Sequence, residues 1–186
     1  DKDLLQLVDD GLGITVLNTK DGEVWHDREG VKARMGVWPE QVVDFLTLLG
    51  DASDNVKGVP GIGENLGMTI LCEIGQITRF PTVKDFLSYC RLVKGTVASA
   101  GKIKGLRGAK LGNPYLRWSF GEAAVIAKRD RAVIGPLAQR LEARMNGNKF
   151  KANTVVAIKL ARAVYFMLKS KTVFDPDRLV AALSKN

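Results

Sequence analysis

Four aspartates stand in two closely spaced pairs, and such pairs are candidates for metal-assisted chemistry on phosphate esters. Asp1 and Asp3 are separated by one residue, which places both carboxylates on one side of an extended segment. Asp51 and Asp54 have a helical i, i+3 spacing, which places both on one side of a helical turn. Paired carboxylates suit Mg²⁺, which takes hard oxygen ligands and keeps several waters for phosphodiester chemistry. The spacing alone also fits turn and cap aspartates, which are the commoner case.

A second candidate for chemistry is a serine within a glycine-rich, cationic stretch. Ser99 lies near Lys102, and a neighbouring amine can activate a serine as a nucleophile. The other cations of this stretch are Lys104, Arg107 and Lys110. Residues 94–113 show no apolar periodicity, so we expect a flexible, cationic loop that could stabilise a phosphoryl transition state. A serine that merely belongs to a phosphate-binding or flexible loop is the alternative.

A glycine-containing turn, VPGIG at residues 59–63, separates two predicted helices. Pro60 fixes its own φ, and the glycines permit left-handed backbone and the close approach of another chain. A turn of this kind at the start of a helix directs free N–H groups outward at the positive end of the helix dipole, which favours phosphate. We therefore predict nucleic-acid contacts at Gly58, Gly61 and Gly63. An ordinary corner between two helices is the alternative.

The net charge of +8 conceals two halves of opposite sign. Residues 1–63 contain 6 Lys and Arg against 12 Asp and Glu, a net charge of −6. Residues 64–186 contain 22 Lys and Arg against 8 Asp and Glu, a net charge of +14. A segment with that excess should bind polyanions by releasing counterions, with steep salt dependence. A well-solvated basic surface is the alternative.

Length and composition exclude several classes of protein. At 186 residues and 46% hydrophobic content, the chain fits one domain or two small ones. Two cysteines, Cys72 and Cys90, and one histidine, His26, argue against structural zinc and against His-dependent triads. The absence of a long apolar run and of a signal peptide predicts a cytoplasmic protein with no membrane partner. Because the sequence opens on a motif and not on methionine, we expect it to be a fragment.

Periodicity and turn signals predict a mainly α fold with a small N-terminal β-hairpin, which is the α+β class. The hairpin is expected at residues 14–17 and 23–26, around an Asp-Gly turn. Helices are expected at residues 28–35, 39–49, 64–74, 83–92, 114–129, 132–145 and 154–169, with a short one after Pro176. Five aromatic residues at helical spacing are assigned to the core and not to base stacking. They are Tyr115, Trp118, Phe120, Tyr165 and Phe166.

The strings DKDLLQLV and GVWPEQVVDFLTLLGDASDNVKGVPGIG resemble the second half of the 5′-3′ exonuclease domain of bacterial DNA polymerase I, a relative of flap endonucleases. This resemblance covers residues 1–63. It implies that Asp1, Asp3, Asp51 and Asp54 help to bind divalent ions, with Mg²⁺ as cofactor. It also implies that the turn is a helix-hairpin-helix that holds duplex DNA without reading bases. The upstream carboxylates of that family have no counterpart here, and Lys57 replaces its usual proline, so an incomplete metal site is expected.

The strings EIGQITRFPTVKDFLSYCRLV, SAGK and GAKLGNPYLRW resemble the C-terminal domain of insertion-sequence transposases of the Piv invertase-like type. This resemblance covers residues 64–186. It implies that Ser99 matches the serine that attacks the DNA phosphodiester, while Ala98 stands where many members have a second serine. The family's RuvC-like domain has no counterpart here. The resemblance also implies a guide RNA as a possible partner.

The two resemblances together predict a chimera of a nuclease-like part, residues 1–63, and a transposase-like part, residues 64–186, that meet at the P-G-I-G turn. The leading function is largely sequence-independent DNA binding in transposition, recombination or repair. The turn and the basic stretch, with Asn113 and Arg117, would make the contacts. The alternatives are a serine-dependent transposase or recombinase, a Mg²⁺-dependent 5′-3′ exonuclease, and an inert fusion fragment. DNA is the expected partner, and a homo-oligomer is a further expectation.

Overall fold

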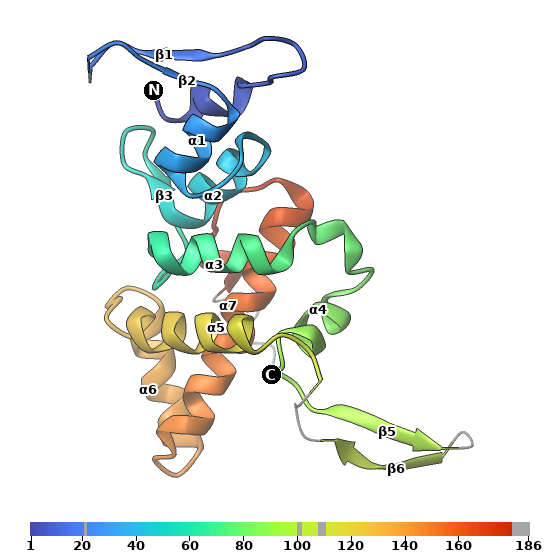
Figure 1. Ribbon diagram of the computed structural model, residues 1–186. Coiled ribbons are helices and arrows are strands. Elements are labelled where there is room, and N and C mark those ends of the chain that lie inside the picture. Colours follow the sequence, from blue (N-terminus) through green and yellow to red (C-terminus); the bar gives the residue numbers. More distant parts are fainter. Residues whose placement is uncertain (21, 100–101, 108–110, 180–186) are drawn as a thin grey trace.

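The computed structural model describes residues 1–20, 22–99, 102–107 and 111–179, and the side chains of residues 95–107 lie outside that description. The described part is mainly helical and carries short antiparallel strand pairs, which confirms the predicted α+β class. Figure 1 shows a strand pair at each of two distant ends, with the helices between them. Within these ranges, no helix is both long and apolar enough to span a bilayer.

The N-terminal elements are a hairpin and four short helices. In order, they are the 3₁₀ helix η1 (Asp3–Leu7), β1 (Val16–Asn18), β2 (Val24–His26), α1 (Arg28–Met35), the 3₁₀ helix η2 (Pro39–Gln41) and α2 (Val42–Leu49). The predicted hairpin is confirmed, and Val16 pairs with His26. Asp27 caps α1 by accepting a hydrogen bond of 2.7 Å from the Gly30 amide, and Gly36 ends the helix in the left-handed region. Both caps could be expected from the sequence.

A third strand pair lies between α2 and α3. The elements here are β3 (Gly50–Asp51), β4 (Val56–Lys57), α3 (Glu64–Ile74), the 3₁₀ helix η3 (Ile77–Arg79) and α4 (Val83–Tyr89). The turn at residues 59–63 therefore follows a strand and precedes a helix, and does not join two helices directly. The helix-hairpin-helix assignment stays a prediction.

The stretch at residues 94–113, predicted as a loop, contains a β-hairpin. Strand β5 (Gly95–Ser99) pairs antiparallel with β6 (Lys102–Arg107), from Gly95 opposite Arg107 to Ser99 opposite Lys102. An irregularity in register at Val97 and Ala98 interrupts the ladder. Figure 1 shows this hairpin extending away from the helices. The loop prediction was wrong because a bulge and scattered glycines break the alternation that reveals strands.

Three helices complete the chain. They are α5 (Pro114–Ala127), α6 (Ile134–Arg144) and α7 (Lys149–Ser170), and a helical turn follows at residues 176–179. Helix α7 begins earlier than predicted because Asn148 caps it, accepting a hydrogen bond of 3.0 Å from the Lys151 amide. Helix α7 packs against α5, α6 and α4, so it forms the central support of the helical body.

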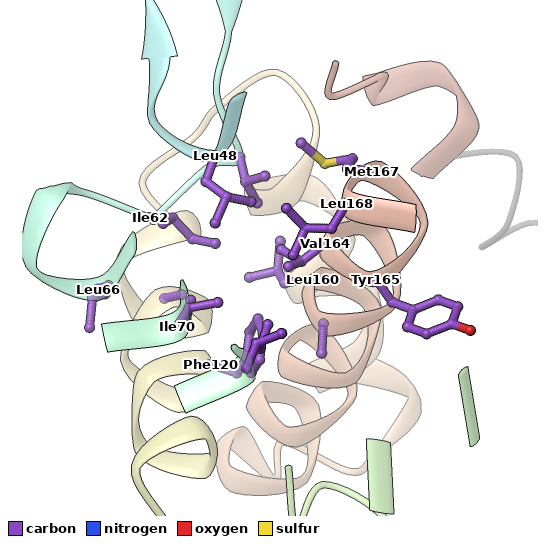
Figure 2. Close-up of a cluster of buried hydrophobic side chains, with 14 of the residues drawn as sticks. Leu48, Ile62, Leu66, Ile70, Phe120, Leu160, Val164, Tyr165, Met167 and Leu168 are labelled. Carbon is purple, nitrogen blue, oxygen red and sulfur yellow. The ribbon is translucent and has the colours of Figure 1, made fainter. Parts of the chain in front are cut away.

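A single hydrophobic cluster runs through both sequence halves. Figure 2 shows Leu48 and Ile62 facing Leu160, Val164 and Leu168 of α7, and all five side chains are buried. The described parts of residues 1–63 and 64–179 therefore share one core. Across the same interface, Lys171 Nζ lies 2.7 Å from Asp44 Oδ1.

The core assignment of the aromatic residues was correct for two of the five. Phe120 and Tyr165 are buried, and Phe120 packs edge-on against Phe86. The Tyr165 hydroxyl donates a hydrogen bond to the Phe80 carbonyl. Tyr115, Trp118 and Phe166 are instead 60%, 53% and 48% exposed among the described residues, so their side chains are not part of the core.

The turn at residues 59–63 is packed directly onto α5. Gly61 has φ of +85°, and a Cβ placed on it would lie 2.2 Å from the Ala123 carbonyl oxygen and 2.8 Å from the Ala127 amide nitrogen. No side chain fits in that space, so glycine is required by both the backbone conformation and the neighbouring helix. Gly63, by contrast, has a negative φ and nothing within 4 Å of its Cβ position.

We predict that Gly61→Ala lowers the free energy of unfolding by about 2–4 kcal/mol, because it combines a disfavoured φ with a backbone clash. Gly63→Ala is the matched control and should change the free energy by less than about 1 kcal/mol. Urea unfolding followed by circular dichroism measures both. Equal losses in the two variants would show that the contact between the turn and α5 is not tight.

Candidate nucleic-acid interface

The two ends of the β5–β6 hairpin are held together by a small network of hydrogen bonds. Arg91, which has a left-handed φ of 54°, donates from Nε to the Gly112 carbonyl at 2.8 Å. Arg117 Nη1 donates to the Arg91 carbonyl at 3.3 Å, and the Asn113 amide donates to the Tyr89 carbonyl at 2.6 Å. These bonds connect the segment before β5 to the segment after β6. The hairpin therefore leaves the body at a fixed position.

Asn113 begins α5 and is buried at that position. Its Oδ1 accepts a hydrogen bond of 3.0 Å from the Leu116 amide, and its Nδ2 donates to the Glu73 carboxylate of α3. The sequence signal for this cap was present, since Asn before Pro114 fits an N-cap followed by proline at the first helical position. The polar groups of Asn113 thus have partners within the chain, whereas the Arg117 side chain is exposed.

The predicted cations of the hairpin fall on or beside β6. Lys102 and Lys104 lie on this strand, Arg107 ends it, and Lys110 lies outside the described residues. Ser99, the predicted nucleophile, is the last residue of β5 and is the backbone partner of Lys102. The structure thus brings together the serine and the lysine that the sequence placed close to each other. The roles predicted for these residues stay predictions.

The glycines within and just before the turn have different surroundings. A Cβ at Gly58 would lie 2.0 Å from the Leu49 carbonyl oxygen, so Gly58, like Gly61, is closely packed inside the chain. Gly63 is exposed and begins α3, and no described side chain caps this helix. The amides of the first turn of α3 therefore have no side-chain cap from the described residues, at the positive end of the helix dipole. Exposed Glu64 lies beside them and opposes an anion.

The four candidate metal-binding aspartates do not gather at one point. Asp1 and Asp51 line a cavity of about 350 Å³ together with Lys2, Lys20 and Arg34. Asp51 Oδ1 accepts a hydrogen bond of 2.8 Å from the Ser53 amide, as in an Asx turn. Asp54 is exposed and does not line this cavity. Asp3 is half-buried, and its Oδ1 has no hydrogen-bond partner among the described residues.

The residues present do not fit a magnesium centre. No group of three or more His, Cys, Asp or Glu side chains in the described ranges could hold a metal ion together. Three cationic side chains line the cavity beside Asp1 and Asp51, and their charge opposes a divalent ion. His26 lines the same cavity with a buried Nε2 that has no partner among the described residues. The arrangement does not support a two-metal reaction by this chain alone.

Both parts of the described chain have counterparts among known proteins. A sequence profile of the transposase IS116/IS110/IS902 family matches residues 53–137. DNA polymerase I of Pseudomonas aeruginosa is 48% identical over 75 residues, which are 40% of this chain and 8% of the polymerase. The chain resembles two families. The match to the transposase family begins before the glycine turn, so that resemblance extends farther toward the N-terminus than the sequence boundary at residue 64 predicted.

Nucleases that are separate proteins show the same nuclease resemblance. The flap endonuclease Xni of Tolumonas auensis is 42% identical over 79 residues, which are 42% of this chain and 29% of that protein. The 5′-3′ exonuclease of Mycoplasma pneumoniae is 32% identical over 114 residues, which are 59% of this chain and 39% of that protein. The chain thus spans less than half the length of each of these relatives. The mixed resemblance predicted from the sequence is confirmed.

We predict that millimolar Mg²⁺ leaves the thermal midpoint of unfolding unchanged relative to EDTA, because ligand binding stabilises only a protein that has a site for the ligand. Asp51→Asn is the companion variant, and it should respond to Mg²⁺ as the parent does. Differential scanning fluorimetry measures both. A rise in midpoint with Mg²⁺ that Asp51→Asn abolishes would contradict this geometry and restore the metal-site interpretation.

Proposed function

We propose that this chain binds DNA largely without regard to sequence, with the β5–β6 hairpin as its main contact. The observation that carries the proposal is the position of this hairpin. A strand with Lys102, Lys104 and Arg107 projects from the body, and its base is fixed by Arg91 and Arg117. A projecting, cationic two-stranded ribbon is a shape that can follow a phosphate backbone or enter a groove.

The charge of the chain supports the same surface. The hairpin belongs to residues 64–186, whose net charge is +14, whereas the β1–β2 hairpin at the other end belongs to a part with a net charge of −6. A polyanion should therefore be attracted to one end of the molecule and repelled from the other. The names of the relatives, which are a polymerase, nucleases and a transposase family, are compatible with DNA as the partner.

The glycine turn is proposed as a second, weaker contact. The first-turn amides of α3, which no described side chain caps, can donate hydrogen bonds to a phosphate oxygen, as in a helix-hairpin-helix. Gly63 is the residue of the turn whose surroundings leave space for a ligand, whereas Gly58 and Gly61 serve packing. Glu64 limits the strength of this contact, so the hairpin should dominate the affinity.

The enzymatic interpretations have unequal support. The backbone pairing of Ser99 with Lys102 agrees with a serine-dependent transposase or recombinase, for which Ser99 would be the nucleophile. The 5′-3′ exonuclease interpretation requires Mg²⁺ at four aspartates, of which only Asp1 and Asp51 line a common cavity among the described residues. Binding is therefore the function proposed for this chain, and a covalent step at Ser99 is its extension. Partnership with a guide RNA and assembly into a homo-oligomer stay predictions.

We predict that Lys102→Gln combined with Lys104→Gln lowers the magnitude of the slope of log affinity against log salt by about 1–2, because each phosphate contact contributes a slope of about 0.9. Affinity for a labelled random-sequence duplex at low salt should fall about tenfold or more. Fluorescence anisotropy at a series of salt concentrations measures both quantities.

Lys2→Gln combined with Lys20→Gln is the matched control for that experiment. It removes the same two charges from the N-terminal part of the chain and should change the affinity by less than about twofold. If both double variants lose affinity equally, net charge and not the hairpin controls binding, and the proposal is wrong.

A further inference from the structure

A groove of about 660 Å³ lies beside the base of the β5–β6 hairpin, between the segment before β5 and helices α5 and α7. Its volume is within the range of pockets that hold small ligands. Three of its lining residues are cationic, namely Arg91, Lys94 and Arg117, and most of the others are apolar, Val125 and Phe150 among them. No acidic residue is among the described lining residues. The groove is therefore cationic, with an apolar floor.

Phe150 is the feature of this groove that packing does not explain. It lies in the first turn of α7 with 87% of its surface exposed, more than any other large apolar residue of the described chain. Exposed Lys149 and Lys151 flank it. An aromatic ring placed among cations is the arrangement on which proteins stack the bases of single strands.

Asn153 provides an unsatisfied polar group in the same groove. Its Oδ1 is buried and has no hydrogen-bond partner among the described residues. A buried acceptor without a partner is costly, so a turn of the Asn153 amide that brings Oδ1 to a ligand donor in the groove would be favourable. Phe150 and Asn153 are nearly one helical turn apart on α7, and they therefore face the same side of the helix.

We propose that this groove holds one unpaired base of a DNA strand whose backbone lies along the hairpin. The base would stack on Phe150, and an N–H of its Watson–Crick edge would bond to Asn153 Oδ1 once the amide turns toward the groove. Every base has such an N–H, but base pairing engages it in a duplex, so only an unpaired base can use the site. Arg91, Lys94 and Arg117 would lie near the flanking phosphates. The inference rests on the proposed DNA binding and adds a preference for distorted or single-stranded DNA.

Gly121 provides a way to close the groove without damaging the fold. It lies within α5 and lines the groove, and a Cβ at this position would meet nothing within 4 Å. Leucine is also a better helix former than glycine. Gly121→Leu should therefore fill the groove while the helix stays intact.

The test uses two duplexes that differ in one nucleotide, an unpaired 2-aminopurine that bulges from one strand. The unmodified chain should bind the bulged duplex about tenfold more tightly than the fully paired duplex, because stacking of one base contributes roughly that much. The fluorescence of 2-aminopurine should fall on binding, as it does when the base stacks. Phe150→Leu and Gly121→Leu should abolish both the preference and the quenching while binding to the paired duplex persists.

Phe166→Leu is the matched control, since Phe166 is also an exposed phenylalanine of α7 but lies outside the groove. It should behave as the unmodified chain does. Equal affinity for the two duplexes with unchanged fluorescence would overturn the inference and leave the proposed DNA binding in place. Failure to bind either duplex would overturn the proposed function, and the inference with it.

Discussion

The close contact between the glycine turn and helix α5 is the constraint on which the rest of the structure depends. It brings the Gly61 backbone against the backbone of Ala123 and Ala127, with no space for a side chain. This contact joins the part that resembles nucleases to the part that resembles transposases. Because Ile62, the next residue, enters the common core, the position of α2 relative to α5 and α7 follows from the same contact. A sequence with two resemblances can therefore fold around one hydrophobic core.

The position of the hairpin follows from that arrangement. Helix α5 begins at Asn113, whose side chain also bonds to Glu73 of α3, so the turn, α3 and the base of the hairpin are mechanically connected. Arg117, one turn farther along α5, bonds to the Arg91 backbone. The cationic ribbon and the groove at its base are consequently presented from a rigid support. Binding elements on rigid supports lose less conformational entropy when they engage a ligand.

The sequence predicted the elements whose signals are local. The bounds of α1 and α3 could be predicted because capping residues and glycines mark their ends, and the β1–β2 hairpin has an Asp-Gly turn. Strands β5 and β6 were not predicted, because GTVAS and KIKGLR lack both a clear alternation and an Asn-Gly or Asp-Gly turn between them. The lysines and glycines of these strands suggested a solvated loop. Only the pairing of the two backbones distinguishes a strand pair from such a loop.

Tertiary contacts explain the other differences between the predicted and the observed residues. Helical spacing places Tyr115 and Trp118 on one face of α5, but it cannot show whether another helix covers that face. In the same way, Phe150 and Asn153 acquire a common environment only when the segment before β5 lies against α5 and α7. The spacing of the aspartate pairs could not predict that Asp54 does not line the cavity of Asp1 and Asp51. Motif identity does not determine the geometry of a site.

Hydrogen exchange of the backbone amides with and without saturating duplex DNA tests the central claim, that DNA is held at the β5–β6 end of the molecule. The account predicts slower exchange in strands β5 and β6 and in the segments before and after them. It predicts unchanged exchange in strands β1 and β2, at the acidic end. Slower exchange confined to β1, β2 and the cavity of Asp1 and Asp51 would contradict it, and would place the DNA at the nuclease-like part.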